Sequence, residues 1–257
     1  MTDPIVETAV ISGVASGIGR ACCELFLARG HRVIGLDSNA SAIMELQNKH
    51  ESSGCAFRQV NLLTDQLNSW GSLNVALKPN EVLSLINCVG GSIARPFERE
   101  DAASLGDWQT FEAAFEFNIK PNILMINLCL PLMIKAQRGY IVNISSVSAR
   151  LALSTVHISY PIAKSAVIGL SRQLASDLAP FNILVNTICP GVISTPRIME
   201  RWEQRTEEQN SQLLEQIPLS RLGAPEDVAE LAYFVSTRKN AYITGAIFDV
   251  NGGMYLP

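Results

Sequence analysis

The sequence predicts an α/β fold in which one doubly wound, parallel sheet of seven strands carries helices on both faces. Short apolar runs alternate with longer helical patterns from one end of the chain to the other, and this alternation is typical of parallel strands joined by crossing helices. We see no internal repeat, low-complexity tract or linker, and 257 residues can enclose one large core. We therefore expect residues 1–257 to form a single domain.

Seven short segments carry the strand pattern. Several are rich in Val and Ile and are bounded by Gly, Asn or Asp, as strands usually are. They are Val6–Ser12, Arg32–Asp37, Ala56–Val60, Val82–Asn87, Tyr140–Ser145, Ile183–Cys189 and Ala246–Val250. The helix-like stretches are Ile18–Ala28, Ser41–His50, Gln66–Leu77, Trp108–Lys135, Tyr160–Leu178 and Glu226–Ser236.

Composition and charge exclude several classes of function. The chain is 47% hydrophobic and 17% charged, as in globular proteins, and its net charge of −4 argues against a nucleic-acid surface. Its longest apolar run, Ile123–Ile134, is too short to span a bilayer, and the first eight residues lack the pattern of a secretory signal. The six cysteines and three histidines show no metal-ligand spacing. We expect a cytoplasmic protein with reduced thiols, no metal, and no nucleic-acid or membrane partner.

A glycine-rich turn joins the first strand to the first helix. Gly13 permits a tight exit from the strand, while Gly17 and Gly19 let the backbone approach a pyrophosphate at the helix N-terminus. The spacing G-x-x-x-G-x-G differs from the commoner G-x-G-x-x-G, so the position between strand and helix carries most of the weight. The turn predicts a dinucleotide site of the Rossmann type.

Asp37 closes the second predicted strand and indicates which dinucleotide binds. A carboxylate at this point accepts hydrogen bonds from both ribose hydroxyls of the adenosine half and repels the 2′-phosphate of NADP. The next residues, Ser38 and Asn39, are not basic, and neither is Ser16 in the glycine turn. NAD(H) is therefore favoured, although an Asp that only caps the turn would leave the preference open.

Tyr160 and Lys164 stand four residues apart in a predicted helix, so their side chains share one face. A nearby ammonium favours the phenolate and lowers the pKa of a tyrosine from its reference of about 10. This pair predicts a tyrosine that exchanges protons near neutral pH. Beside a nucleotide-binding turn, it indicates nicotinamide redox chemistry.

As a set, these residues resemble the short-chain dehydrogenase/reductase family over essentially the whole chain. The further motifs that carry the resemblance follow in the family's order. They are Asn87-Cys88-Val89-Gly90 for Asn-Asn-Ala-Gly, Asn118 in the long fourth helix, Ile144-Ser145-Ser146 at a strand end, Pro190-Gly191 with Thr195, Arg221-Leu222-Gly223 with Pro225-Glu226-Asp227, and Ile243-Thr244-Gly245.

The resemblance implies four catalytic residues. Tyr160 would exchange a proton with the substrate oxygen, and Lys164 would lower the tyrosine pKa and bind the nicotinamide ribose. Ser146 would hydrogen-bond the carbonyl oxygen, and Asn118 would hold a water that links Lys164 to solvent. Ser146 precedes Tyr160 by 14 residues, one more than the family's usual spacing, so Ser145 stays an alternative for the serine role.

The resemblance also implies a set of cofactor contacts from the glycine turn to the segment after the sixth strand. Asn61 replaces an Asp that often contacts the adenine amine, and its amide oxygen can still accept that bond. Besides Tyr160 and Lys164, the expected NAD-binding residues are Gly13, Ser16, Gly17, Ile18, Gly19, Asp37, Asn61, Leu62, Asn87, Val89, Gly90, Pro190, Gly191, Val192, Ile193 and Thr195.

The substrate would lie above the nicotinamide. The highly charged segment 192–218 would form a lid over it, or else a solvated pair of surface helices. Pro161 lacks a backbone donor, so the catalytic helix could kink or start late, and 99–110 is longer than is usual in the family. The candidate substrate residues are Ser92, Ile93, Arg95, Ser148, Arg150, Leu153, His157, Val192 and Ile198.

The leading hypothesis is an NAD(H)-dependent oxidoreductase that interconverts a secondary alcohol and a ketone on a small or medium-sized molecule. One alternative is a 3-oxoacyl-(carrier protein) reductase, which would want NADPH, and Asp37 opposes that. Another is a non-catalytic dinucleotide-binding protein, which typically lacks part of the Tyr, Lys, Ser and Asn set. The resemblance also implies a homotetramer or homodimer.

Overall fold

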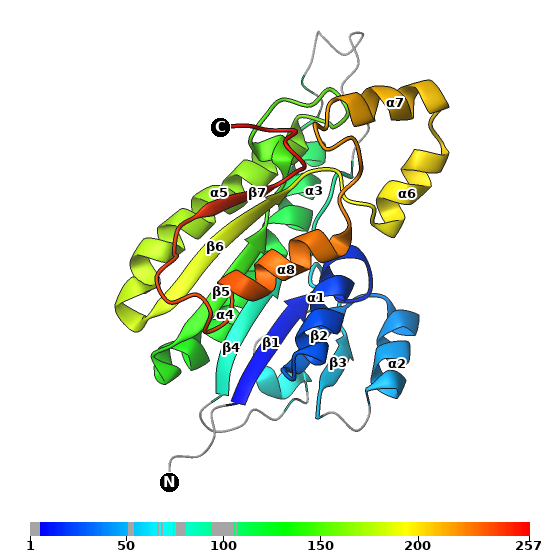
Figure 1. Ribbon diagram of the computed structural model, residues 1–257. Helices are drawn as coiled ribbons and strands as arrows, with labels where there is room; N and C mark the ends of the chain where they lie inside the picture. Colours follow the sequence, from blue (N-terminus) through cyan, green and yellow to red (C-terminus); the bar gives the residue numbers. More distant parts are fainter. Residues whose placement is uncertain are drawn as a thin grey trace.

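Seven parallel strands form one sheet in the order β3-β2-β1-β4-β5-β6-β7 (Figure 1). The computed structural model describes residues 6–50, 54–65, 67, 69–73, 75, 81–93, 105 and 107–257. Every neighbouring pair of strands is parallel. The strands are β1 (Val6–Ser12), β2 (Arg32–Asp37), β3 (Ala56–Gln59), β4 (Glu81–Asn87), β5 (Gly139–Ile144), β6 (Ile183–Pro190) and β7 (Ile247–Val250).

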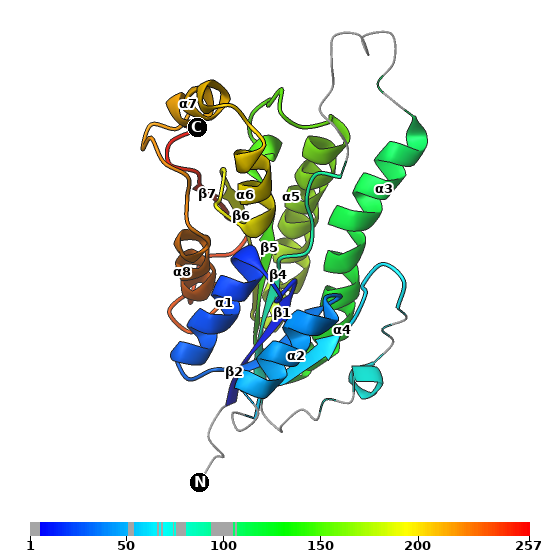
Figure 2. The ribbon, with the colours of Figure 1, turned by 90° about the vertical axis from the view of Figure 1, so that its right-hand side faces the viewer.

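Helices cover both faces of the sheet (Figure 2). The helices α1, α2 and α8 pack on one face, and α4 and α5 pack on the other, with α3 against α5. Their bounds are α1 (Gly17–Ala28), α2 (Ala40–Lys49), α3 (Trp108–Asn118), α4 (Lys120–Ala136), α5 (Ser159–Leu178), α6 (Pro196–Glu203), α7 (Glu207–Glu215) and α8 (Pro225–Val235). The predicted single-domain, doubly wound fold is confirmed.

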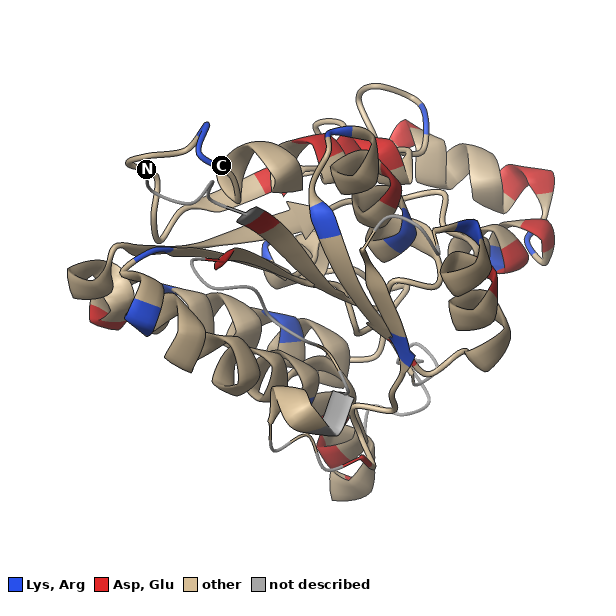
Figure 3. Cartoon of the chain, turned by 90° about the horizontal axis from the view of Figure 1, so that it is seen from below, with Lys and Arg blue, Asp and Glu red and all other residues tan. Residues whose placement is uncertain are grey.

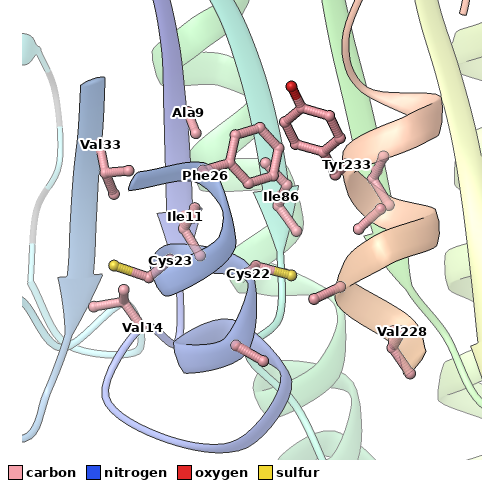
Figure 4. Close-up of a cluster of buried hydrophobic side chains, with 14 of the residues drawn as sticks. Ala9, Ile11, Val14, Cys22, Cys23, Phe26, Val33, Ile86, Val228 and Tyr233 are labelled. Atoms are coloured by element: carbon pink, nitrogen blue, oxygen red, sulfur yellow. The ribbon is translucent and has the colours of Figure 1, made fainter. Parts of the chain in front are cut away.

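Two apolar clusters hold these layers together, one on each face of the sheet. In the first, Phe26 from α1 and Tyr233 from α8 meet edge to face, with ring centroids 5.0 Å apart, above Ile86 of β4 (Figure 4). In the second, Met125 and Met133 of α4 pack on the opposite face and are fully buried. Every residue of β4 is buried, as expected for a central parallel strand with helices on both sides.

All seven predicted strands are present, and their ends differ from the prediction by no more than one residue. The predicted helix Trp108–Lys135 is interrupted at Ile119, which separates α3 from α4. Pro161 neither kinks nor delays α5, because the helix starts at Ser159 and places the proline in its first turn, where a missing N–H costs nothing. The predicted helix Gln66–Leu77 lies partly outside the described residues. The described part of this range includes a 3-10 turn at Trp70–Leu73.

By length and composition, the run Trp108–Ala136 could cross a membrane. It is longer than the apolar run recognised in the sequence because α3 and α4 nearly join. However, 44% of its most apolar window is buried inside the protein, and Met125, Cys129 and Met133 lie in the cluster beneath the sheet. The packing therefore explains its hydropathy as that of a core helix.

The strand order reverses between β1 and β4, because the chain builds outward from β1 to β3 and then returns to pair β4 with the other edge of β1. Helices and loops leave the carboxyl ends of these two strands in opposite directions, which opens a crevice there. Charged positions of both signs are interspersed over the chain (Figure 3). Most of the residues that the sequence predicts to bind the cofactor and to catalyse the reaction lie around this crevice.

Candidate active site

A cavity of about 560 Å³ opens at the carboxyl ends of the central strands. One end of it is lined by the glycine turn and by Asp37, and the other by Tyr160 and the segment that carries α6. Most of the predicted cofactor residues line this one cavity: Gly13, Ser16, Gly17, Ile18, Gly19, Asp37, Asn61, Leu62, Val89, Gly90, Tyr160, Lys164, Pro190, Gly191, Val192, Ile193 and Thr195.

The glycine turn leaves the start of α1 open to the cavity. Gly13 and Gly17 have φ of 74° and 53°, which favours glycine, and a Cβ on Gly19 would overlap the carbonyl oxygen of Gly13. Ser16 is the N-cap residue, but its side chain caps no backbone N–H, and the first turn of α1 holds no acidic residue. The uncapped N–H groups of this turn fit a pyrophosphate.

Asp37 is held rigidly at the other side of the turn. Its Oδ2 accepts from the backbone N–H of Ala15 at 2.9 Å, and its Oδ1 accepts from that of Asn39 at 2.9 Å. Each oxygen keeps a lone pair, so the carboxylate can still accept from a diol such as a ribose. Asn61 also lines this end, although its Oδ1 already accepts from the N–H of Leu63.

At the opposite end, Ser146 and Tyr160 both line the cavity, and the side chain of Ser146 acts on the hydroxyl of Tyr160. Burial raises the pKa of Tyr160 above its usual value, while Ser146 and the charges of Arg197 and Arg201 lower it by less. Lys164 is not among the groups that act on this pKa, so the predicted lowering by the lysine stays a prediction. Tyr160 is a neutral phenol at pH 7, able to donate a proton into the cavity.

Lys164 is almost completely buried, and its Nζ donates to the carbonyl of Ile144 at 2.9 Å. Removal from water lowers the pKa of Lys164 to about 8, so the ammonium form still predominates at pH 7. The neighbouring serine, Ser145, donates to the main-chain carbonyl of Lys164 at 2.8 Å and lies buried. Of the two candidate serines, Ser146 is the one that acts on Tyr160.

Asn118 lies behind the cavity wall rather than in it. Its Oδ1 accepts from the N–H of Gly91 at 2.9 Å, and its Nδ2 donates to the carbonyls of Gly91 and Ala114. A Cβ on Gly90 would stand 2.7 Å from this Oδ1 and 2.8 Å from the Nζ of Lys164. Asn118 thus fixes the loop after β4 next to Lys164, and its side chain has little capacity left for a water.

Other predicted site residues divide between the cavity and its surroundings. Ser92, Ser148, Leu153 and Ile198 line the cavity, and Ser148 Oγ donates to Ser146 Oγ at 2.9 Å. Ile93 is exposed outside it, and Arg95 lies outside the described residues.

Three predicted contacts are corrected because the side chains have other partners and do not line the cavity. Asn87 donates to Asn143 in the neighbouring strand at 2.8 Å. Arg150 pairs with Asp249 at 3.2 Å, and its guanidinium lies over the ring of Tyr255. His157 accepts the N–H of Ser159 at the start of α5.

Sequence reasoning missed three arginines in the cavity wall, Arg197, Arg201 and Arg205. In the sequence they are only part of the highly charged segment 192–218. Their spacing of four residues, which places side chains on one helix face, is the signal that could have found them. It also missed apolar lining from Phe117, Val156 and Leu213.

The strand order and the cavity at its switch point define a class, the Rossmann-like dinucleotide-binding folds. A family model described as Enoyl-(Acyl carrier protein) reductase matches residues 13–255. The chain therefore belongs to the short-chain dehydrogenase/reductase family, whose members are oxidoreductases that bind a nicotinamide dinucleotide.

Among similar proteins is a 3-oxoacyl-[acyl-carrier-protein] reductase of Aquifex aeolicus, 33% identical over 97% of either chain. Another is a 2,3-dihydroxy-2,3-dihydro-p-cumate dehydrogenase of Pseudomonas putida, 30% identical over 96% of this chain and 93% of the relative. A solved structure of a 3-oxoacyl-[acyl-carrier protein] reductase with bound NAD, from Brucella melitensis, superposes with a TM-score of 0.80. It is 27% identical, over 98% of this chain and 92% of that one.

Proposed function

We propose that this protein is an NAD(H)-dependent oxidoreductase that interconverts a secondary alcohol and a ketone on a small or medium-sized molecule. The observation that carries the proposal is one cavity that joins an uncapped helix start and the Asp37 carboxylate to the side chains of Tyr160 and Ser146. The first end suits a dinucleotide, and the second suits proton exchange with an oxygen atom. A bound nicotinamide supplies or accepts the hydride at the substrate carbon.

Tyr160 acts as the acid and base in this proposal. In reduction the neutral phenol donates its proton to the carbonyl oxygen, and in oxidation the phenolate accepts the proton of the alcohol. Ser146 donates its hydroxyl to the same substrate oxygen, which positions it and stabilises the negative charge that develops there. Ser148, bonded to Ser146 Oγ, orients that hydroxyl.

Lys164 and Asn118 support this centre from behind. The ammonium of Lys164 lies next to Gly90 and is placed to bind the hydroxyls of the nicotinamide ribose and to stabilise the phenolate of Tyr160. Asn118 is a positioning residue that holds Gly91, and through it the loop after β4, against Lys164. We therefore assign Asn118 to the geometry of the site, in place of the water-holding role.

Asp37 supports NAD(H) over NADP(H). Its two oxygens are fixed by backbone N–H groups and the residue lines the cavity, where a 2′-phosphate would meet a like charge. The Brucella melitensis relative, a carrier-protein reductase, was solved with bound NAD, so a relationship to such reductases does not oppose NAD.

A 3-oxoacyl-(carrier protein) reductase is the second candidate, and the Aquifex aeolicus relative favours it. The Pseudomonas putida relative acts on a cyclic diol at comparable identity, which supports the broader alcohol and ketone chemistry. A non-catalytic role is disfavoured because Tyr160, Ser146 and Lys164 all line the same cavity.

The test is the absorbance of the reduced nicotinamide when the purified protein receives NAD or NADP with secondary alcohols, including hydroxy acids and cyclic diols. We expect NAD-dependent turnover, lowered about 10²- to 10⁴-fold in Tyr160→Phe, while calorimetry shows NADH binding changed by no more than a few-fold. A 3-oxoacyl thioester reduced better than every free ketone would favour the second candidate. NADH binding without turnover of any probe would favour a binding protein.

Three further parts of the proposal concern the setting of the enzyme. The pair α6 and α7 lies beyond the carboxyl ends of the strands, which supports a lid over the substrate (Figure 1). Exposed apolar side chains on α3, α4 and α5, including Trp108, Ile123 and Ile162, support a homodimer or homotetramer, which light scattering can measure. The six free cysteines support a reducing, cytoplasmic location.

A further inference from the structure

Three arginines of the substrate-side wall come from one short stretch of chain. Arg197 and Arg201 stand four residues apart on α6, and Arg205 follows two residues after that helix ends. All three line the cavity. Residues four apart share a helix face, so α6 presents one basic face to the cavity.

The loop after β4 holds two of these guanidinium groups in place. Arg197 Nη2 donates to the carbonyl of Ser92 at 2.6 Å, and Arg201 Nη2 approaches the same oxygen at 3.4 Å. A Cβ on Gly91 would overlap Arg197 Nη1, so the absence of a side chain at Gly91 makes room for the guanidinium. The two arginines thus converge on the Ser92 carbonyl in the loop after β4.

Their positive charge is not neutralised by the described part of the protein. Six other arginines there form ion pairs with carboxylates: Arg20, Arg29, Arg32, Arg150, Arg221 and Arg238. No carboxylate among the described residues lies within ion-pair distance of Arg197, Arg201 or Arg205. Glu200 acts on Arg197 only from beyond that distance.

The like charges are close enough to act on each other and on Tyr160. Partial burial, and then the charge of Arg201, lower the pKa of Arg197, because both make its charged guanidinium less stable there than in water. Both arginines also lower the pKa of Tyr160. A bound anion would relieve this repulsion and would lie beside the phenol that exchanges the proton.

We propose that the substrate carries an oxyanion, a carboxylate or a phosphate, which Arg197 and Arg201 bind on the α6 side of the cavity, with Arg205 adding positive charge. The inference rests on the proposed function and names its substrate class: a hydroxy acid or hydroxyalkyl phosphate and the matching ketone. The start of α1 suits the cofactor pyrophosphate, and these guanidinium groups meet a different wall, near Ser92 and Tyr160.

The test compares matched pairs of probes with the same carbon skeleton. One arm uses 3-oxo acids of four to eight carbons and 4-oxo acids of five to eight carbons against their primary amides, and a second arm uses hydroxyacetone phosphate against hydroxyacetone. With NADH saturating, we expect kcat/KM for the anionic member of one arm to exceed that of its neutral partner at least about tenfold. The arm that shows this preference identifies the anion.

Arg197→Gln and Arg201→Gln should each lower kcat/KM for the anionic probe about 10- to 100-fold and leave the neutral partner within a few-fold. Arg172→Gln is the matched control, since it removes the same charge from an exposed position on α5, and it should leave the ratio unchanged. Equal rates for anionic and neutral probes in the parent would overturn the proposal. So would an arginine variant that weakens NADH binding without changing the ratio.

A binding measurement separates this inference from the proposed function. Calorimetry of the enzyme–NAD complex with butanoate, butanamide and inorganic phosphate needs no turnover. If no probe is turned over but butanoate or phosphate binds and Arg201→Gln abolishes the binding, the proposed function fails and the anion site stands. If neither anion binds more tightly than butanamide, the anion site is refuted whatever the turnover.

Discussion

The hydroxyl of Ser145 donates to the main-chain carbonyl of Lys164 at 2.8 Å, whereas the side chain of the next residue, Ser146, acts on the hydroxyl of Tyr160. Adjacent residues at the end of a strand point to opposite sides, so the hydroxyl of Ser145 braces α5 and that of Ser146 lies on the side of Tyr160. Substitutions at these two neighbouring positions should therefore have different effects: on stability at Ser145 and on catalysis at Ser146.

Ser146→Ala should lower kcat about 10²- to 10³-fold, because it removes a donor aimed at the reacting oxygen. Ser145→Ala should lower kcat only a few-fold but reduce the free energy of unfolding by about 1 kcal/mol, since a buried hydrogen bond is lost. Steady-state kinetics and urea unfolding of both variants measure the two effects. A larger loss of kcat in Ser145→Ala than in Ser146→Ala would reverse the assignment.

Lys164→Met should separate stability from activity. Burial lowers the pKa of Lys164 from 10.5 to about 8, so at pH 7 the folded protein holds a proton less readily than the unfolded chain does. That disfavours folding by about 3 kcal/mol below pH 8, at 1.36 kcal/mol per unit. We expect Lys164→Met to lose turnover and yet to unfold at an equal or higher temperature at pH 7.

The difference in stability between Lys164→Met and the parent protein should depend on pH. Between pH 8 and 10.5 the unfolded chain binds more protons at this lysine than the folded protein does, so the stability of the parent rises with pH in that window. The advantage of Lys164→Met over the parent should therefore shrink as pH rises from 8 toward 10.5. An advantage that grows in this window would show that the folded-state pKa is not lowered.

The sequence predicted the sheet well because local signals determine it. Apolar runs such as Val6–Ser12 and Arg32–Asp37 are strands with the predicted bounds, and glycine spacing depends on neighbouring residues alone. The predictions for Arg150 and His157 failed for a different reason. The carboxylate that pairs with Arg150 lies 99 residues away, and the choice of His157 between cavity and helix start depends on side-chain direction.

Most of the candidate site could be predicted where a motif contains its own geometry, as with Tyr160 and Lys164. The raised pKa of Tyr160 could not, because it results from burial by several elements that are distant in sequence. The arginines of α6 could be predicted only in part from the sequence. Their spacing is local, but only the fold brings that helix face to the cavity.

Asp37→Ala should change cofactor preference. The loss of the carboxylate removes acceptors for the ribose hydroxyls and the repulsion of a 2′-phosphate, so the ratio of kcat/KM for NAD over NADP should fall at least about tenfold. Asp37→Asn is the control: it keeps the shape and one acceptor oxygen, and it should give an intermediate ratio. If neither variant changes the ratio, Asp37 serves only the turn through Ala15 and Asn39.

Arg150 tests whether a guanidinium near the site serves the fold instead of the substrate. It pairs with Asp249 of β7 at 3.2 Å and lies over the ring of Tyr255. The side chain of Arg150 is 19% exposed and that of Asp249 is 16% exposed. Removing one partner leaves the other charge partly buried and unpaired, so Arg150→Met and Asp249→Leu should each cost about 1–3 kcal/mol of unfolding free energy.

The double variant should cost less than the sum of the single ones, because it leaves no unpaired charge. In all three variants the preference for an anionic over a neutral substrate should match that of the parent, in contrast to Arg197→Gln. Urea unfolding and the matched ketone pairs measure both quantities on the same preparations. A change of anion preference in Arg150→Met with unaltered stability would instead show that Arg150 contacts the substrate, as the sequence predicted.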